Sequence, residues 1–166
     1  MSLEKINMLS YNEAYKTFAG CCGSDSWVKK MITGRPFKSK NEMFEASENT
    51  WNSLYENDWL EAFEHHPMIG DLNSLKEKYA SARMLAENEQ AGVNEASVFT
   101  ISELSKFNAE YLKKFGYIFI VCATGKSAEE MLSFIKERIK NDPETEIKIA
   151  MKEQGKITKL RLEKLL

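Results

Sequence analysis

Residues 64–90 read EHHPMIGDLNSLKEKYASARMLAENEQ and contain both histidines of the chain, His65 and His66. Pro67 fixes its own φ angle and disfavours α geometry at His66, so a helix is predicted to end at this point. Only histidine has an ordinary pKa near neutrality, about 6.5, which makes this turn the first candidate for proton transfer. The alternative is a helix end with two solvated histidines, and the turn alone favours this alternative because exposed histidine is common.

The composition is that of an ordinary globular protein. Of the 166 residues, 43% are hydrophobic and 29% are charged, which suits one domain with a buried core. The formal net charge is −2 with both signs interspersed, and no run reaches the roughly 18 apolar residues of a membrane span. The N-terminus lacks the pattern of a secretory signal. We therefore predict a cytoplasmic protein with no nucleic-acid and no membrane partner.

The three cysteines do not form a disulfide framework. Cys21 and Cys22 are adjacent and could bridge only with severe strain, and Cys122 is distant in sequence. Neither the cysteines nor the His65-His66 pair has the spacing of metal ligands. We expect reduced, packed cysteines and no metal site.

Most of the chain carries helix signals. A serine followed three residues later by glutamate, the capping-box pattern, starts helices at Ser10, Ser39 and Ser127. Further helices are expected over 24–32, from an Asn57 cap to the His-Pro stop, from Asn94 to Gly116, and from Pro143 to Leu165. The predicted fold class is all-α: a single-domain bundle of about eight helices over residues 1–166, with one short extended segment.

That segment is the run YIFIVCA at 117–123, the one continuous apolar and β-rich stretch. Periodicity does not distinguish a short strand from an extended segment here. A lone extended run among helices leaves backbone N–H and C=O groups that need partners. A bound polar ligand could supply them, and the alternative is a buried run that pairs locally.

A family resemblance is carried by short motifs spread along nearly the whole chain. They are Arg35-Pro36-Phe37, Trp59-Leu60-x-Ala62-Phe63, His66-Pro67-x-Ile69-Gly70-Asp71, Glu89-Gln90-Ala91-Gly92, Asn108-x-x-Tyr111-x-x-Lys114-Phe115-Gly116, the run from Phe119 to Ser127, and Lys156-Ile157-Thr158-x-Leu160-Arg161-Leu162. Each motif is weak alone, but together, in this order and spacing, they are specific. The sequence resembles the 2-oxo-4-hydroxy-4-carboxy-5-ureidoimidazoline (OHCU) decarboxylases.

The resemblance implies an all-helical carboxy-lyase, a homodimer without cofactor, that converts OHCU to (S)-allantoin and CO₂ in the urate branch of purine metabolism. It implies that His66 and Glu89 are catalytic. The residues that it places against this small-molecule substrate are Pro67, Ala86, Gln90, Phe119, Ile120, Val121, Cys122, Ala123 and Arg161. In this interpretation the extended run is a backbone wall that binds the planar ring.

The substrate chemistry agrees with a chain that offers no cofactor site. The carboxylate of OHCU lies on a carbon beside a ring C=N, so this imine can accept the electrons that loss of CO₂ releases. The protein has to hold the carboxylate out of the ring plane, stabilise the developing charge and move a proton. We therefore expect no metal, thiamine or pyridoxal group.

Two positions depart from the family pattern. Met68 stands where many bacterial members have arginine, and Ala86 stands where the family commonly has serine. The missing hydroxyl removes a substrate hydrogen bond worth about 0.5–1.5 kcal/mol. The alternative function is thus a non-catalytic or specificity-shifted helical relative that binds a small molecule or a peptide.

Overall fold

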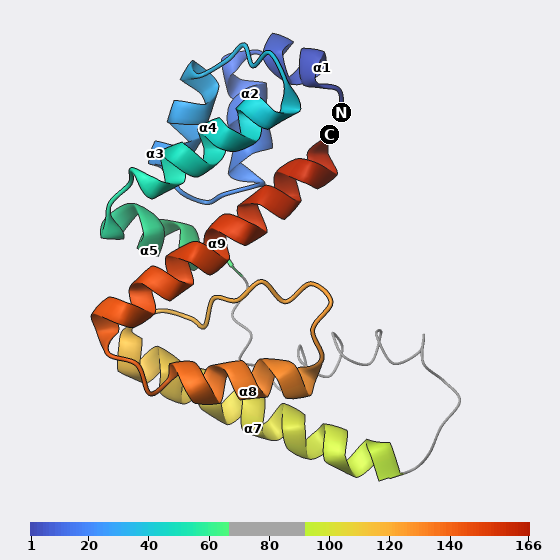
Figure 1. The fold of residues 1–166 in the computed structure, drawn as a ribbon, viewed down its shortest axis with the longest axis vertical. Helices are drawn as coiled ribbons and strands as arrows, with labels where there is room; N and C mark the ends of the chain where they lie inside the picture. The colour runs from blue at the N-terminus through green and yellow to red at the C-terminus, as the bar shows by residue number, and fades with distance from the viewer. Residues whose placement is uncertain (67–91) are drawn as a thin grey trace. The chain divides into compact units, whose positions relative to one another are not determined.

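The computed structural model describes residues 1–66 and 92–166, with the backbone alone for 92–97. The described residues form eight helices and no strand, so the predicted all-α class is confirmed (Figure 1). The helices are α1 (Leu3–Met8), α2 (Tyr11–Ala19), α3 (Asp25–Thr33), α4 (Lys40–Asn52), α5 (Glu56–Glu64), α7 (Gly92–Phe115), α8 (Ala128–Arg138) and α9 (Pro143–Leu165). None of these helices is long and apolar enough to cross a membrane.

The chain divides into two compact units. The first unit contains Met1–His66, Ile120–Cys122 and Ile147–Leu166, and the described residues of the second unit are 92–119 and 123–146. One domain over residues 1–166 stays a prediction.

Local capping explains most helix boundaries. Ser10 and Ser127 each form a complete capping box, with Glu13 and Glu130 as the reciprocal partners. Ser39 forms half of one: its hydroxyl accepts from the Glu42 N–H at 3.1 Å, while the Glu42 carboxylate accepts from the Lys38 N–H instead. Serine capping is therefore confirmed at all three predicted sites.

Three boundaries differ from expectation. Helix α1 was not predicted, and Ser2 caps it by accepting from the Lys5 N–H. Helix α5 begins before Asn57, so the Asn57 cap was wrong: the Asp58 carboxylate accepts from the Tyr55 N–H at 3.2 Å and starts the helix earlier. Helix α7 begins at Gly92, two residues before the expected Asn94.

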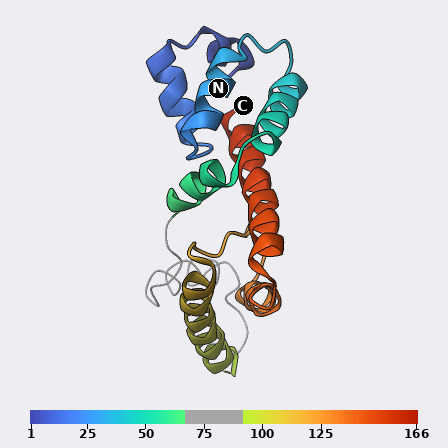
Figure 2. The ribbon, with the colours of Figure 1, turned by 90° about the vertical axis from the view of Figure 1, so that its left-hand side faces the viewer.

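In the first unit, α4 and the α9 residues from Ile147 onward run side by side (Figure 1, Figure 2). Trp51 of α4 is 3% exposed, and its indole N–H donates to the Met151 carbonyl at 2.9 Å. A Cβ on Gly155 would lie 3.3 Å from the ring carbon Cδ1 of Trp51. Glycine at this position therefore lets the indole approach the helix backbone.

The remaining core of the first unit lies among its N-terminal helices. The ring of Phe18 meets that of Trp27 edge-on at a centroid distance of 6.0 Å. The Trp27 indole N–H donates to the Ser47 carbonyl at 3.2 Å. Because these groups are buried, their apolar surface and satisfied polar atoms fix α2, α3 and α4 together.

The second unit is organised around a fully buried carboxylate, Glu146. The carboxylate accepts hydrogen bonds from the Tyr111 hydroxyl, from Nε and a terminal nitrogen of Arg138 at 2.8 and 2.6 Å, and from Asn141 at 2.7 Å. Burial, followed by the bond to Glu146, raises the pKa of Tyr111 above its ordinary value. Helices α7 and α8 lie side by side here (Figure 1), and the cluster ties both to the start of α9.

Candidate active site

His66 lies directly after α5, at the helix stop that the His-Pro pair predicted. Its N–H donates to the Phe63 carbonyl at 3.1 Å, which turns the chain out of the helix. Within the same unit, α9 presents Gln154, Thr158 and Arg161, whose spacing of four and three residues puts them on one helix face.

The imidazole of His66 is joined to this face of α9. Its Nε2 lies 2.5 Å from Oε1 of Gln154, and Nε2 of Gln154 donates to the Thr158 hydroxyl at 3.2 Å. Gln154 is fully buried and Thr158 is 2% exposed, whereas His66 is half-buried. One ring nitrogen is thus held by a buried amide, and the side chain as a whole is partly exposed.

The surroundings of His66 favour the neutral imidazole. Burial is the main cause that lowers its pKa below the ordinary 6.5. The hydrogen bond to Gln154 acts in the opposite direction, while the positive charge of Arg161 and the neighbouring His65 lower the pKa further. At neutral pH the ring is therefore a proton acceptor.

His65 is in a different environment. Its side chain is exposed, and its Nδ1 lies 3.0 Å from the Glu61 carbonyl one helical turn back. A Cβ on Gly23 would lie only 2.4 Å from Cγ of His65, so the ring packs directly on the Gly23 backbone. Of the two histidines, His66 is the one hydrogen-bonded to a side chain of α9, among the residues that the structure describes.

Arg161 and the two adjacent cysteines, Cys21 and Cys22, belong to the first unit. A terminal nitrogen of Arg161 donates to the Cys21 carbonyl at 3.2 Å, which places the guanidinium beside the turn after α2. Cys21 and Cys22 are free and buried, as expected, and burial raises the pKa of each thiol to about 11. The thiols are therefore protonated at neutral pH and unsuited to act as nucleophiles.

The 120–122 stretch of the first unit has no regular secondary structure and forms no strand. The Cys122 N–H donates to Glu153 Oε2 at 2.8 Å, and the other oxygen of this carboxylate accepts from Lys156 at 2.5 Å. The Cys122 N–H is one of the backbone donors in the run that was predicted to bind a ligand. In the structure it is already bonded to a side chain of α9. Ile120 is buried, while Val121 and Cys122 are half-buried.

Phe119 and Ala123 belong to the second unit. Phe119 is 5% exposed, with the Arg138 guanidinium 4.6 Å from its ring centre and the Tyr111 ring edge-on at 5.1 Å. Ala123 is half-buried. The other predicted site residues, Pro67, Ala86, Glu89 and Gln90, lie outside the described residues.

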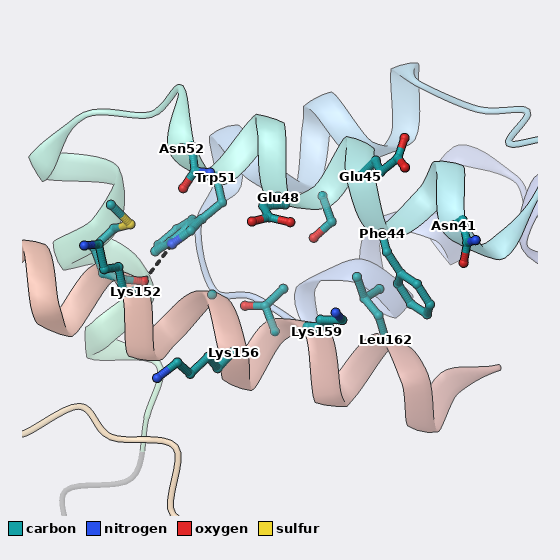
Figure 3. A pocket seen from close by; sticks show the side chains of 14 residues that line it. Asn41, Phe44, Glu45, Glu48, Trp51, Asn52, Lys152, Lys156, Lys159 and Leu162 are labelled. Atoms are coloured by element: carbon teal, nitrogen blue, oxygen red, sulfur yellow. Dashed lines mark hydrogen bonds between the residues drawn. The ribbon is translucent and has the colours of Figure 1, made fainter.

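A groove of about 660 Å³ follows α4 and α9 on the first unit (Figure 3). Glu45 and Glu48 line its α4 side, and Lys152, Lys156 and Lys159 line its α9 side. None of the residues predicted to bind substrate lines this groove. Among the described residues no group of three or more His, Cys, Asp or Glu side chains is placed to hold a metal ion.

Comparison with known proteins shows similarity to one family along nearly the whole chain. The profile of the OHCU decarboxylases matches residues 7–163. A uric acid degradation bifunctional protein of Arabidopsis thaliana is 41% identical over 145 residues, which are 87% of this chain and 45% of that protein. The 2-oxo-4-hydroxy-4-carboxy-5-ureidoimidazoline decarboxylase of Amia calva is 28% identical over 167 residues, covering 100% of this chain and 95% of the relative.

A solved structure of the same family is also similar to this chain in fold and sequence. A crystal structure of OHCU decarboxylase in the presence of (S)-allantoin is 38% identical, with a TM-score of 0.71, and the match covers 89% of this chain and 95% of that one. The chain spans less than half the length of two bifunctional relatives, 45% of the Arabidopsis protein and 32% of one from a Bacillus strain.

Proposed function

The chain belongs to the OHCU decarboxylase family, and we propose that it removes CO₂ from OHCU to give (S)-allantoin. The observation that carries the proposal is the family match over residues 7–163. The environment of His66, half-buried and favouring the neutral ring, supports it because decarboxylation here requires a proton to be moved.

In the proposed reaction the bond between the ring carbon and the carboxylate breaks, and its electron pair moves into the adjacent C=N. The imine nitrogen gains a proton, and the product of this step is an enol. Neutral His66 then accepts the hydroxyl proton as the enol becomes the ketone, and a proton is added to the neighbouring carbon. The sum is one carboxylate substrate and one proton giving allantoin and CO₂.

Arg161 and the 119–123 backbone have binding roles in this proposal. The Arg161 guanidinium balances substrate charge, and backbone groups of 119–123 contact the carbonyl and amide edges of the ring. Glu89 and Gln90 contribute as the family resemblance implies. Delivery of the proton to one face of the carbon sets the S configuration.

The proposal is tested by supplying OHCU with uricase and hydroxyisourate hydrolase and measuring CO₂ release. We expect a rate proportional to the amount of this protein, and the same rate after dialysis against a chelator, because the substrate imine accepts the electrons. A rate that Zn²⁺ or Mn²⁺ restores after dialysis would contradict this mechanism. Saturable binding of a peptide, with no effect on CO₂ release, would favour the alternative of a binding module.

We also propose that the protein is a homodimer in the cytoplasm, as the family resemblance implies. The two buried free cysteines are compatible with a reducing compartment. Light scattering is expected to give twice the 19.1 kDa mass of one chain. A mass of one chain at micromolar concentration would contradict the dimer.

A substitution at Ala86 tests whether the serine hydroxyl that the family commonly has at this position would add a hydrogen bond to the substrate. Ala86→Ser is expected to lower KM several-fold, because about 1 kcal/mol corresponds to roughly a fivefold change. Turnover should change less, since a contact made equally in the ground and transition states alters KM alone. Steady-state kinetics on the coupled substrate measure both, and an unchanged KM would show that position 86 does not touch substrate.

A further inference from the structure

We propose that Gln154 is a positioning residue that fixes the neutral tautomer of His66, with the proton on Nε2 and the basic lone pair on Nδ1. The proposal rests on the 2.5 Å contact between His66 Nε2 and Gln154 Oε1, which joins residues 88 positions apart. The catalytic meaning of this assignment rests on the proposed function, but the tautomer itself does not.

The structure shows both partners of the Gln154 amide. Its carbonyl oxygen faces His66 Nε2, and its NH₂ group donates to the Thr158 hydroxyl at 3.2 Å. A carbonyl oxygen accepts hydrogen bonds and donates none. His66 Nε2 must therefore carry a proton in both the neutral and the charged ring.

Burial makes this arrangement costly to change. Gln154 is fully buried and Thr158 is 2% exposed, so an amide rotated away from His66 would leave polar atoms without partners. Both residues lie one turn apart on α9, a helix of 23 residues. The acceptor is thus held on a rigid element, as a group that orients a catalytic side chain should be.

The other charged and titratable groups around His66 do not replace this role. Arg161, through its positive charge, and the neighbouring His65 lower the pKa of the His66 ring. Gln154 is the group that raises this pKa, because its oxygen stabilises the protonated ring. Cys22, hydrogen-bonded to Thr158, is protonated at neutral pH, since burial raises its pKa to about 11.

The test compares two substitutions of similar size. Gln154→Leu removes the acceptor and keeps an apolar side chain, whereas Gln154→Glu keeps an oxygen acceptor and adds charge. Nitrogen-15 NMR of the histidine ring, in a His65→Gln background that leaves one histidine, reports the tautomer and the pKa. His65→Gln without other changes is expected to leave activity near that of the wild type.

We expect the parent protein to show a protonated Nε2 in the neutral ring. In Gln154→Leu the proton should distribute over both nitrogens and the pKa of His66 should fall further. In Gln154→Glu the Nε2 proton should remain and the pKa should rise. The acid limb of the pH profile of kcat/KM should move to lower pH in Gln154→Leu and to higher pH in Gln154→Glu. The kcat of Gln154→Leu should be reduced about 10–100-fold, and its KM should change less.

An unchanged tautomer and pKa in Gln154→Leu would overturn the inference, even if activity fell, because the loss would then be one of packing. Should Gln154→Leu not fold, the Gln154→Glu titration decides alone: a pKa that does not rise overturns the inference. If the NMR results are as expected but the wild type releases no CO₂ from OHCU, the proposed function fails and the tautomer assignment stands.

Discussion

His66→Ala is expected to lower kcat/KM for OHCU by about 10²–10⁴-fold, the usual contribution of a general acid–base residue. The folded environment lowers the pKa of His66, so the neutral ring is the active form and activity should fall only below the ordinary range near 6.5. The melting temperature should fall by only a few degrees, because the side chain lies outside the apolar core but its loss leaves the buried oxygen of Gln154 without a partner, at about 1–3 kcal/mol. Coupled kinetics from pH 5 to 8, with a thermal melt, measure these effects.

The matched control is His65→Ala. The His65 side chain is exposed and contacts the Glu61 carbonyl of its own helix, so the rate constant should stay within a few-fold of wild type. A larger loss in His65→Ala than in His66→Ala would show that the proton-transfer group is misplaced. A rate that keeps rising as the pH falls from 6.5 to 5 would contradict a neutral His66.

Arg138→Met is expected to lower the free energy of unfolding by about 3–5 kcal/mol, the cost of leaving a buried charge without its partner. Glu146 is fully buried, and Arg138 supplies two of the donors on its carboxylate. The substitution also removes the guanidinium from the Phe119 ring, 4.6 Å away. Denaturant unfolding, followed by circular dichroism at the helix band, measures the change.

Lys136→Met is the control on the same helix. Its ammonium lies 3.4 Å from the Glu103 carboxylate, and the two side chains are 41% and 25% exposed, unlike the fully buried Glu146. A pair in solvent contributes about 0–1 kcal/mol, so the loss should be several-fold smaller than for Arg138→Met. Equal losses in the two variants would contradict the assignment of Glu146 as the centre of the second unit.

The sequence could predict the helices because their signals are local. Serine and glutamate three residues apart marked α2, α4 and α8, and Pro67 marked the end of α5. Helix α1 was missed because six residues are too few for a periodic apolar pattern. The Asn57 cap failed because a carboxylate at position 58 competes more effectively for the free N–H groups.

The partners of the site were harder to predict, because they are distant in sequence. Nothing near His66 indicates that Gln154 receives its ring N–H, nor that Glu153 takes the Cys122 N–H. A signal for Gln154 did exist: it lies seven residues before Arg161, on the same face of the predicted last helix. The family resemblance implies that Glu89 is catalytic, but Glu89 lies outside the described residues; among the described residues, Gln154 is the side chain hydrogen-bonded to the His66 ring.

The most direct test of the proposed decarboxylation is the handedness of its product. Circular dichroism of allantoin formed from coupled OHCU should show the S enantiomer alone at early times with wild type. The same signal should be nearly absent with His66→Ala, where uncatalysed decay gives a racemate. A racemic product from wild type, at the rate seen without the protein, would contradict the claim that this chain is an OHCU decarboxylase that protonates one face.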